Sequence, residues 1–421
     1  MREERHWIVT QIGSREHYGV PRGFERIGHL KLLYTDVWSR RPMGLLRYGN
    51  ATMRAVAGRC HPEIPSTKVV SFNARAFAHA LGSLRWKQSI DERYTFFLRV
   101  GGEFDRSVVR HLQRRGTLDP RADAFFGYNT GSLQSIRFCK QLGVPTVLNQ
   151  IDPAKTEEDI VAREAAKWPD WEKSPGRIPQ AYWDHMQAEW AAADLLVVNS
   201  DWSKQALIHQ GVPPEKLQVV PLTYQPEASG DAPHPRAGKG PLTVLWLGNV
   251  ILRKGIQYLI EAAKLLDAKD FRFIVAGPIG ISRDAVASAP SHVSFFGRVT
   301  RDSTSRLYRQ ADVFVLPTLS DGFAITQVEA MAHGLPVVTT PNCGKVVTQG
   351  VDGLIVPAGD AHSLATAITT LHADRELLAQ MSRNALVRST HFLIPTQALR
   401  IEAALGEWSR NPHDAATPKE L

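Results

Sequence analysis

Short apolar segments rich in β-branched and aromatic residues alternate with helical patterns along the whole chain. Continuous apolar strands of this length, separated by helices, are typical of parallel sheets that are covered on both faces. The sequence therefore predicts an α/β protein with doubly wound sheets. The segments that we expect to form strands are HWIVTQIG, TKVVSFN, RYTFFLRV, ADAFFGYN, VPTVLNQI, ADLLVVNS, LQVVPL, LTVLWLG, FRFIVAG, VSFFG, ADVFVLP, LPVVTT and GLIVPAG.

The chain is long enough to form two domains. A chain of 421 residues exceeds the size at which one hydrophobic core keeps growing. Residues 226–241 are rich in Pro, Gly and Ser and lack apolar periodicity, as a linker does. We therefore expect Rossmann-like domains over 1–225 and 242–395 that face a central cleft. A C-terminal helix and a disordered tail are expected over 396–421.

The composition is that of a globular protein in a reducing compartment. Hydrophobic residues make up 43% of the chain and charged residues 22%, which excludes wholesale disorder. The cysteines are odd in number and far apart, which argues against a disulfide framework and a Cys-based metal site. No segment approaches the roughly 18 apolar residues of a membrane span, and the charged start does not resemble a signal peptide. These features indicate a cytoplasmic protein.

The positive charge is concentrated in the first half. The formal net charge is +8, and residues 1–225 hold 31 Lys and Arg against 24 Asp and Glu, whereas the remainder holds 19 against 18. A basic half suits an anionic membrane surface, a polyanionic acceptor or nucleic acid. A solvated Arg-rich surface without a partner explains the excess equally well. Because no aromatic-basic RNA motif or helix-turn-helix signal occurs, we do not expect nucleic acid as a partner.

A pair of cations lies between a strand and a helix in the second half. In the segment LWLGNVILRKGIQYLI, the strand over 245–247 leads into a loop with Arg253 and Lys254. Such a strand-to-helix turn faces the cleft, where a forked guanidinium and a compact ammonium would neutralise a diphosphate. Taken alone, an Arg-Lys pair in a loop is more often surface charge. The pair becomes a candidate site together with the carboxylates of the next segment.

Two carboxylates follow a later strand. Asp321 lies in the loop after the strand over 313–316, and Glu329 lies about two turns inside a helix expected over about 324–333. A carboxylate at a helix entrance accepts hydrogen bonds from sugar hydroxyls, and Glu329 has the reach to bridge two vicinal ribose hydroxyls. The alternatives are a simple helix cap for Asp321 and a solvated helix face for Glu329.

The backbone next to Asp321 is a further candidate for ligand contact. Gly322 lacks a Cβ and so permits close approach of a ligand. The N–H groups of Phe323 and Ala324 would lie at the start of the helix, where an anion such as phosphate is favoured.

Residues 241–360 resemble the donor domain of the retaining glycosyltransferases of family 4, which have the two-domain GT-B fold. The resemblance implies that Lys254 and an Arg bind the diphosphate, that Asp321 faces the donor sugar and that Glu329 faces the ribose. It also implies that the turn with Arg298 and Val299 contacts the base.

The chain departs from the family pattern at two places. Gly248-Asn249-Val250 stands where the family usually has Gly-Arg-Leu, so the resemblance gives the role of the diphosphate-binding Arg to Arg253. The first acidic residue is Asp321, whose side chain is one methylene shorter than the usual Glu. This difference bears on the identity of the donor sugar.

The first half has a weaker likeness to the same family, particularly to members that build bacterial exopolysaccharides and cell-surface glycans. Gly13 and His17 follow the first strand, in the segment SREHYGVPRGF that would lie at the cleft. For His17 a packing or capping role is an equal alternative. Asn149-Gln150-Ile151-Asp152 stands where many relatives have a sugar-binding His, so only the positions of Gln150 and Asp152 suggest a role.

The resemblance implies transfer of a hexose-type sugar from a UDP- or GDP-sugar to a glycan or lipid-linked acceptor, with retention. It implies no metal and no cofactor besides the donor substrate, and an Asp-x-Asp pair in a suitable loop is missing from the sequence. We expect a cytoplasmic protein that is peripheral on the inner face of the membrane. One alternative is another enzyme on the same fold, an epimerase or a phosphorylase. A second alternative is a non-catalytic protein that binds nucleotides or nucleic acid.

Overall fold

The computed structural model describes residues 4–39, 59–74, 89–116, 118–172, 176–225 and 240–410. Most of the predicted linker and the end of the predicted disordered tail lie outside the described residues.

The first domain contains a seven-stranded parallel sheet in the order β3-β2-β1-β4-β5-β6-β7. From β3 to β6 this is the order of a dinucleotide-binding Rossmann sheet, with the switch point between β1 and β4. The strands are β1 (His6–Gln11), β2 (Leu30–Thr35), β3 (Val69–Ser71), β4 (Asp123–Tyr128), β5 (Thr146–Gln150), β6 (Leu195–Val198) and β7 (Leu217–Val219).

The second domain repeats this arrangement with a six-stranded parallel sheet in the order β10-β9-β8-β11-β12-β13. Its switch point lies between β8 and β11, so the loops after these two strands border one crevice. The strands are β8 (Leu242–Leu247), β9 (Phe271–Ala276), β10 (Val293–Gly297), β11 (Val313–Leu316), β12 (Val337–Thr339) and β13 (Gly353–Ile355).

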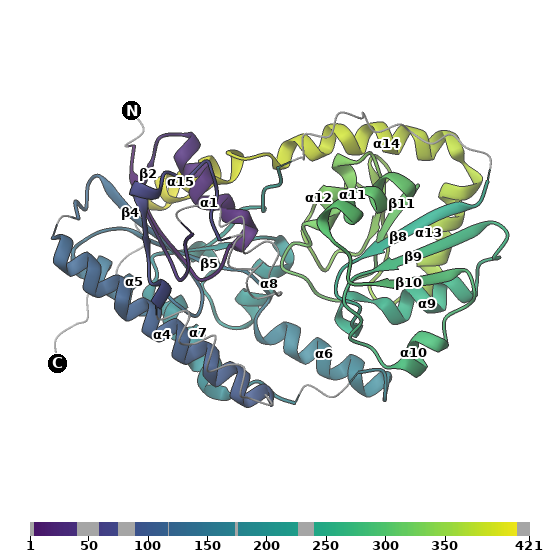
Figure 1. The fold of residues 1–421 in the computed structure, drawn as a ribbon, viewed down its shortest axis with the longest axis horizontal. Coiled ribbons are helices and arrows are strands. Elements are labelled where there is room, and N and C mark those ends of the chain that lie inside the picture. Colours follow the sequence, from purple (N-terminus) through teal and green to yellow (C-terminus); the bar gives the residue numbers. More distant parts are fainter. Residues whose placement is uncertain are drawn as a thin grey trace.

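Helices cover both faces of each sheet (Figure 1). With the first sheet go α1 (Gly19–Arg26), α4 (Ile90–Arg115), α5 (Leu133–Gln141), α6 (Lys155–Lys167), α7 (Gln180–Ala192) and α8 (Asp201–His209). With the second go α9 (Ile256–Lys264), α10 (Arg283–Ala287), α11 (Arg301–Gln310), α12 (Thr326–Ala332), α13 (Ala361–Ala373) and α14 (Arg375–Ser389). The last helix is α15 (Thr396–Arg410).

Successive residues of the central strands pack into hydrophobic clusters on opposite faces of the sheet. In β1, Ile8 belongs to one buried cluster, whereas Trp7 and Val9 belong to another. In β8, Trp246 and Leu245 are divided between two clusters in the same way. A strand that is buried on both faces must be apolar throughout. The prediction of doubly covered parallel sheets is therefore confirmed.

One predicted strand is wrong: the segment RYTFFLRV lies inside α4. Ser89 and Glu92 form a capping box, in which each side chain accepts a hydrogen bond from the other residue's backbone N–H. Phe104, Val108 and Leu112 then recur at helical spacing and are buried against the first sheet. The cap and this spacing outweigh the local β propensity.

Among the described residues, α6 and α15 each contact or cross between the two domains. α6 belongs to the first domain and contacts the second at α9 and at η5 (Leu252–Lys254) (Figure 1). There the Glu164 carboxylate accepts hydrogen bonds from Tyr258 Oη at 2.8 Å and from Gln257 Nε2 at 3.2 Å. In the other direction, the chain crosses back after α14, and α15 packs against α1 and β6 of the first domain.

The position of α15 leads to a test of stability. Ile401 is fully buried in the core cluster of the first domain, whereas Leu399 on the same helix is 45% exposed. We expect Ile401→Ala to lower the free energy of unfolding by about 2–5 kcal/mol, because it leaves a cavity in this core. The measurement is urea unfolding, with Leu399→Ala as the matched control, expected to change stability by less than about 0.5 kcal/mol. Equal effects of the two substitutions would contradict the docking of α15.

Candidate functional site

The loops after β8 and β11 meet because these strands are neighbours in the second sheet. The loop after β8 leads into η5, which carries Arg253 and Lys254, and the loop after β11 carries Asp321. The two loops are joined by their backbones, since the Leu319 N–H donates to the Arg253 carbonyl at 2.9 Å. The Thr318 hydroxyl donates to the same carbonyl at 3.3 Å. The structure thus brings together the predicted cations and the first predicted carboxylate.

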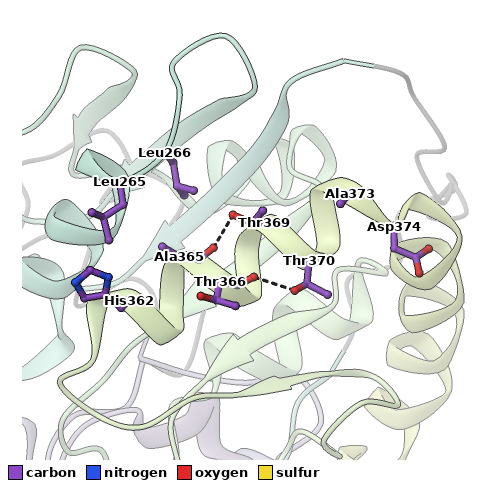
Figure 2. Close-up of a pocket in the computed structure, with 9 residues that line it drawn as sticks. All are labelled: Leu265, Leu266, His362, Ala365, Thr366, Thr369, Thr370, Ala373 and Asp374. Carbon is purple, nitrogen blue, oxygen red and sulfur yellow. Dashed lines mark hydrogen bonds between the residues drawn. The ribbon is translucent and has the colours of Figure 1, made fainter.

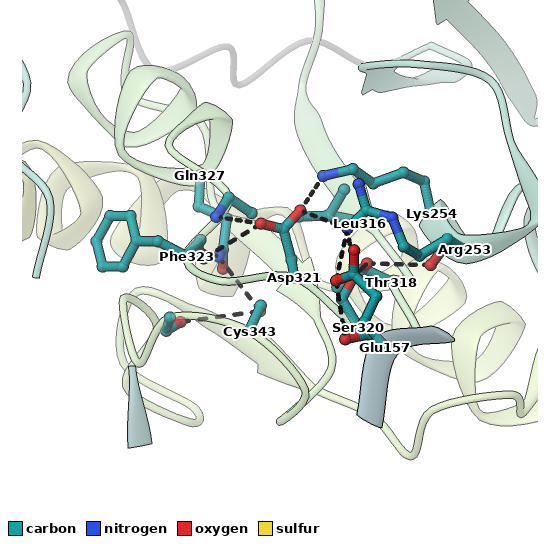
Figure 3. A network of polar contacts seen from close by, with 12 residues as sticks. Glu157, Arg253, Lys254, Leu316, Thr318, Ser320, Asp321, Phe323, Gln327 and Cys343 are labelled. Carbon is teal, nitrogen blue, oxygen red and sulfur yellow. Dashed lines mark hydrogen bonds and ion pairs between the residues drawn. The ribbon is translucent and has the colours of Figure 1, made fainter. Parts of the chain in front are cut away.

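Figure 3 shows that these side chains form one network with a carboxylate of the first domain. Arg253 Nη1 donates to Glu157 Oε2 at 3.1 Å and to the Ser320 carbonyl at 2.8 Å. Lys254 Nζ pairs with Asp321 Oδ2. Glu157 lies in the first turn of α6 and also accepts a hydrogen bond from the Ser320 hydroxyl at 3.2 Å. The network therefore spans the two domains.

The charges of this network are largely shielded from solvent. Burial and the neighbouring Arg253 guanidinium lower the pKa of Lys254 to about 7. Burial raises the pKa of the Glu157 carboxyl above its usual value, against the opposing attraction of Arg253. Shielded charges require partners, and here carboxylates of the chain itself supply them. An anion that enters must therefore compete with Glu157 and Asp321 for the two cations.

Asp321 also shapes its own loop. Its Oδ1 atom accepts hydrogen bonds from the N–H groups of Phe323 and Ala324, at 3.2 and 3.0 Å. Ala324 has a left-handed backbone with φ 62°, so α12 begins only at Thr326 rather than at about residue 324. The two N–H groups that were expected to face a phosphate thus bind the Asp321 carboxylate. The helix-cap alternative for Asp321 is wrong, because the N-cap of α12 is Ile325 and no side chain caps this helix. Asp321 Oδ1 instead closes the turn before the helix, while Oδ2 remains with Lys254.

Gly322 lies close to the backbone of the first domain. A Cβ at this position would lie 2.0 Å from the carbonyl oxygen of Ile151 and 3.4 Å from Cα of Asp152. Only glycine fits against this backbone. The sequence predicts close contact with a ligand here, whereas the structure shows contact with the loop after β5. The Asp321 loop is therefore held against the first domain.

Glu329 and His17 line a cleft of about 1030 Å³ between the two domains. The Tyr308 hydroxyl donates a hydrogen bond to Glu329 Oε2 at 3.0 Å. Glu329 is therefore tied to a neighbouring helix and is not simply on a solvated helix face. Burial and the Glu329 carboxylate hold the pKa of Tyr308 well above its usual value. The cleft is also lined by Ser14, Glu16, Arg22 and His61 of the first domain and by Ile325, Tyr308 and His333 of the second.

The loop after β1 is strained where it borders the cleft. Glu16, His17 and Tyr18 are consecutive left-handed residues with φ of 51°, 50° and 62°. Such residues cost roughly 1–3 kcal/mol each and occur mostly at functional sites. Tyr18 is buried and packs edge-on against Trp38, which holds the loop, and His17 is exposed. Gly13 also has a positive φ, and its N–H donates to Asp36 Oδ1 at 2.9 Å.

Arg298 and Val299 follow the carboxyl end of β10. Arg298 is exposed, and Val299 packs against the cluster that contains Tyr308 and Phe323. Neither is among the described residues that line the cleft. Their predicted contact with a base stays a prediction.

The part of the chain that the structure describes has neither a metal-binding cluster nor a membrane-spanning helix. It contains no group of three or more His, Cys, Asp or Glu that could hold a metal ion. Across the same ranges, each helix is either too short or too polar to span a membrane. Metal independence stays a prediction.

A hollow of about 570 Å³ on α13 is a weaker candidate for a site (Figure 2). The Thr369 and Thr370 hydroxyls that line it donate to carbonyl groups of their own helix. These two hydroxyls already donate within their own helix, so toward a ligand they would act as hydrogen-bond acceptors only.

The family model described as glycosyl transferases group 1 matches residues 241–374, which include the whole cation and carboxylate segment. The match lies within the second domain and is to a glycosyl transferases group 1 domain. The predicted resemblance is thereby confirmed.

Curated relatives carry glycosyltransferase names. An amylovoran biosynthesis glycosyltransferase of Erwinia amylovora is 29% identical over 42% of this chain and 47% of its own length. A phosphatidyl-myo-inositol mannosyltransferase of Mycobacterium leprae is 30% identical over 48% of this chain and 55% of its own length. The chain thus spans about half the length of the curated relatives that it matches.

Solved structures extend the likeness to both domains. HepE of Anabaena in complex with UDP has a TM-score of 0.60 at 17% identity, covering 96% of this chain and 100% of that one. A sucrose-phosphate synthase of Thermosynechococcus elongatus has a TM-score of 0.62 at 18% identity, with the same coverage. WaaG, a glycosyltransferase involved in lipopolysaccharide biosynthesis, has a TM-score of 0.59 at 18% identity and covers 94% of this chain and 99% of its own. The predicted GT-B fold is confirmed.

No sequence pattern predicts a functional role for Glu157, Ser320 or Tyr308. Glu157 lies in a run of charged residues at the start of α6 and has no motif that marks it. The signal for Tyr308 is weak: it is a lone aromatic residue in a polar helix that precedes β11. Their partners become apparent only when the loops and the two domains are placed together.

Proposed function

We propose that the chain is a retaining glycosyltransferase that moves a hexose-type sugar from a nucleoside-diphosphate sugar to an acceptor hydroxyl. The observation that carries this proposal is the convergence of Arg253, Lys254 and Asp321 at the switch point of the group 1 domain. The names of the relatives support a role in surface polysaccharide or glycolipid synthesis. HepE, whose structures contain UDP and UDP-glucose, supports a nucleotide-sugar donor.

Arg253 and Lys254 would stabilise the departing diphosphate. In the reaction, the acceptor oxygen bonds to the anomeric carbon as the bond from that carbon to the diphosphate breaks. The diphosphate leaves with the bonding electron pair and receives the hydroxyl proton. Two cations fixed in a shielded site stabilise this developing negative charge without reorganisation. No metal and no further cofactor take part in this proposal.

The two carboxylates would have different tasks. Glu329 lines the interdomain cleft, whose volume of about 1030 Å³ suits a nucleotide, and would accept hydrogen bonds from the ribose. Asp321 lies next to Lys254 and the first domain, and would contact the donor sugar.

The alternatives from the sequence differ in their products. An epimerase would return a nucleotide sugar, and a phosphorylase would release a sugar phosphate. Analysis of the products from a labelled donor separates them, and the anomeric configuration of the product tests retention. Localisation at the cytoplasmic face of a membrane, through the basic first half, remains part of the proposal.

Replacing Lys254 by Met should weaken nucleoside diphosphate binding and alter its pH dependence. The lost charged hydrogen bond should cost roughly 1.5–3 kcal/mol. In the ligand-free protein the pKa of the Lys254 ammonium group is about 7. Above pH 7 Lys254 must therefore take up a proton when a diphosphate binds. Affinity should therefore be highest below pH 7 and fall as the pH rises from 7 to 9. Calorimetry of UDP and GDP across this range measures both effects.

The Lys254→Met variant is also the control for titration of the ligand. Any pH dependence that belongs to the nucleotide itself persists in the variant, so the difference between the two proteins reports Lys254. Equal affinities and equal pH profiles would reject Lys254 as a diphosphate ligand.

Two further substitutions should separate the carboxylates. Glu329→Gln should weaken binding of nucleoside diphosphate and of nucleotide sugar alike, because both contain the ribose. Asp321→Asn should not weaken nucleotide binding and should tighten it, because it removes the carboxylate that competes with the diphosphate for Lys254. It should lower the transfer rate, because interactions made only with the reacting sugar appear in the chemical step. Nucleotide affinity and transfer rate are measured for both variants. If Asp321→Asn loses nucleotide affinity as severely as Glu329→Gln, the division of roles is incorrect.

A further inference from the structure

Tyr308 places a phenol hydroxyl beside the carboxylate of Glu329 in the interdomain cleft. It lies on α11, which precedes β11, and lines the cleft together with Glu329 of α12. The Tyr308 side chain is only 1% exposed, so packing fixes its position. Its hydroxyl donates a hydrogen bond to Glu329 Oε2 at 3.0 Å, and the Thr326 carbonyl, at 3.5 Å, is the more distant acceptor.

The Tyr308 ring packs against two other rings. It stacks on His333, with centroids 4.8 Å apart and planes at 22°, and it lies tilted against Phe314 of β11 at 6.0 Å. His333 follows the last turn of α12, and its Nδ1 atom lies 2.8 Å from the Glu329 carbonyl oxygen. Because a carbonyl oxygen only accepts, Nδ1 is the donor. The stacked pair of rings is therefore bonded to both the backbone and the carboxylate of Glu329.

The Tyr308 hydroxyl acts as a donor toward this carboxylate. Burial and the negative charge of Glu329 hold the pKa of Tyr308 well above its usual value, so the phenol keeps its proton. Each oxygen of an ionised carboxylate has two acceptor positions. A hydrogen bond from Tyr308 to Oε2 is therefore compatible with a second hydrogen bond to the same oxygen from a ligand.

A fixed carboxylate matters most for a ligand with two vicinal hydroxyl groups. Several orientations of a flexible Glu side chain can meet one hydroxyl, whereas two adjacent hydroxyls are met together only when the carboxylate plane faces both. A side chain that is oriented in advance also loses less conformational entropy on binding.

We propose that Tyr308 is a positioning residue, which orients Glu329 for the ribose diol and thereby sets a preference for ribonucleotides over 2′-deoxyribonucleotides. This inference rests on the proposed function. It adds the residue that lets the Glu329 site select the sugar of the nucleotide.

The test compares ribonucleotides with their 2′-deoxy analogues. UDP, GDP and the two analogues are titrated into the full chain by calorimetry, for the wild type and for Tyr308→Phe. We expect the wild type to bind a ribonucleotide about tenfold more tightly than its analogue, which lacks one hydrogen bond to a charged group. Tyr308→Phe should raise the dissociation constant of the ribonucleotide about fivefold and that of the analogue less than about twofold. A smaller folded fraction lowers the number of sites and leaves the ratio of the two constants unchanged.

Tyr34→Phe is the matched control. Tyr34 is fully buried in the first domain, and its hydroxyl oxygen lies 2.9 Å from His111 Nδ1. Neither residue lines the interdomain cleft. The control thus removes an equally buried phenol oxygen and should leave both dissociation constants unchanged.

A second background shows whether Tyr308 acts through Glu329. In Glu329→Ala no carboxylate remains to be oriented, so adding Tyr308→Phe should cause no further loss of ribonucleotide affinity.

Three outcomes would overturn the inference: no preference for the ribonucleotide in the wild type, the same preference in Tyr308→Phe as in the wild type, or a further loss of affinity in the Glu329→Ala background. If the wild type binds UDP or GDP and one of these results follows, the role of Tyr308 is rejected and the proposed function stands. If the wild type binds neither UDP nor GDP, the proposed function itself is rejected.

Discussion

The ion pairs of Arg253 and Lys254 with Glu157 and Asp321 are the interaction on which the arrangement of this molecule depends. Both cations lie in η5 of the second domain, whereas Glu157 belongs to α6 of the first. Shielded charges are tolerated only in pairs, so the two domains must stay close while these partners remain together. The Tyr258 and Gln257 hydrogen bonds to Glu164 hold the same helix about two turns further on.

In this network the positive charges of the proposed diphosphate site are already neutralised by carboxylates of the chain. Glu157 and Asp321 occupy the cations that a diphosphate would bind, so binding exchanges one set of ion pairs for another. The short Asp321 side chain divides its oxygens between its own loop and Lys254. Entry of a donor would free Glu157 from Arg253, and through α6 this step would change the contact between the domains.

Much of the fold follows from local patterns. Apolar runs such as ADVFVLP and LTVLWLG form strands that are buried on both faces of a parallel sheet, as their continuous apolar pattern indicates. Arg253 and Asp321 could be expected to meet because both follow strands at one edge of a sheet. The segment RYTFFLRV shows the limit of this reasoning, since the capping box directly before it and the helical stripe after it overrule its β propensity.

Other features depend on how the domains meet, and no local pattern encodes them. The contact of Gly322 with Ile151, the reach of Glu157 to Arg253 and the return of α15 to the first domain each join segments far apart in sequence. The left-handed backbone of Ala324 is equally hidden, because alanine is a good helix former. Sequence reasoning thus finds the cations and carboxylates but not the partners that hold them.

The affinity of Glu157→Gln for nucleoside diphosphate measures whether the ion pairs of the chain compete with a diphosphate for Arg253. The substitution keeps the size of the side chain and removes the negative charge that competes with the diphosphate for Arg253. We expect binding about tenfold tighter than in the wild type, a difference of about 1.4 kcal/mol. Asp159→Asn is the control, because it removes the same charge from an exposed position on the same helix and should leave affinity unchanged. Weaker or unchanged binding in Glu157→Gln would contradict the account.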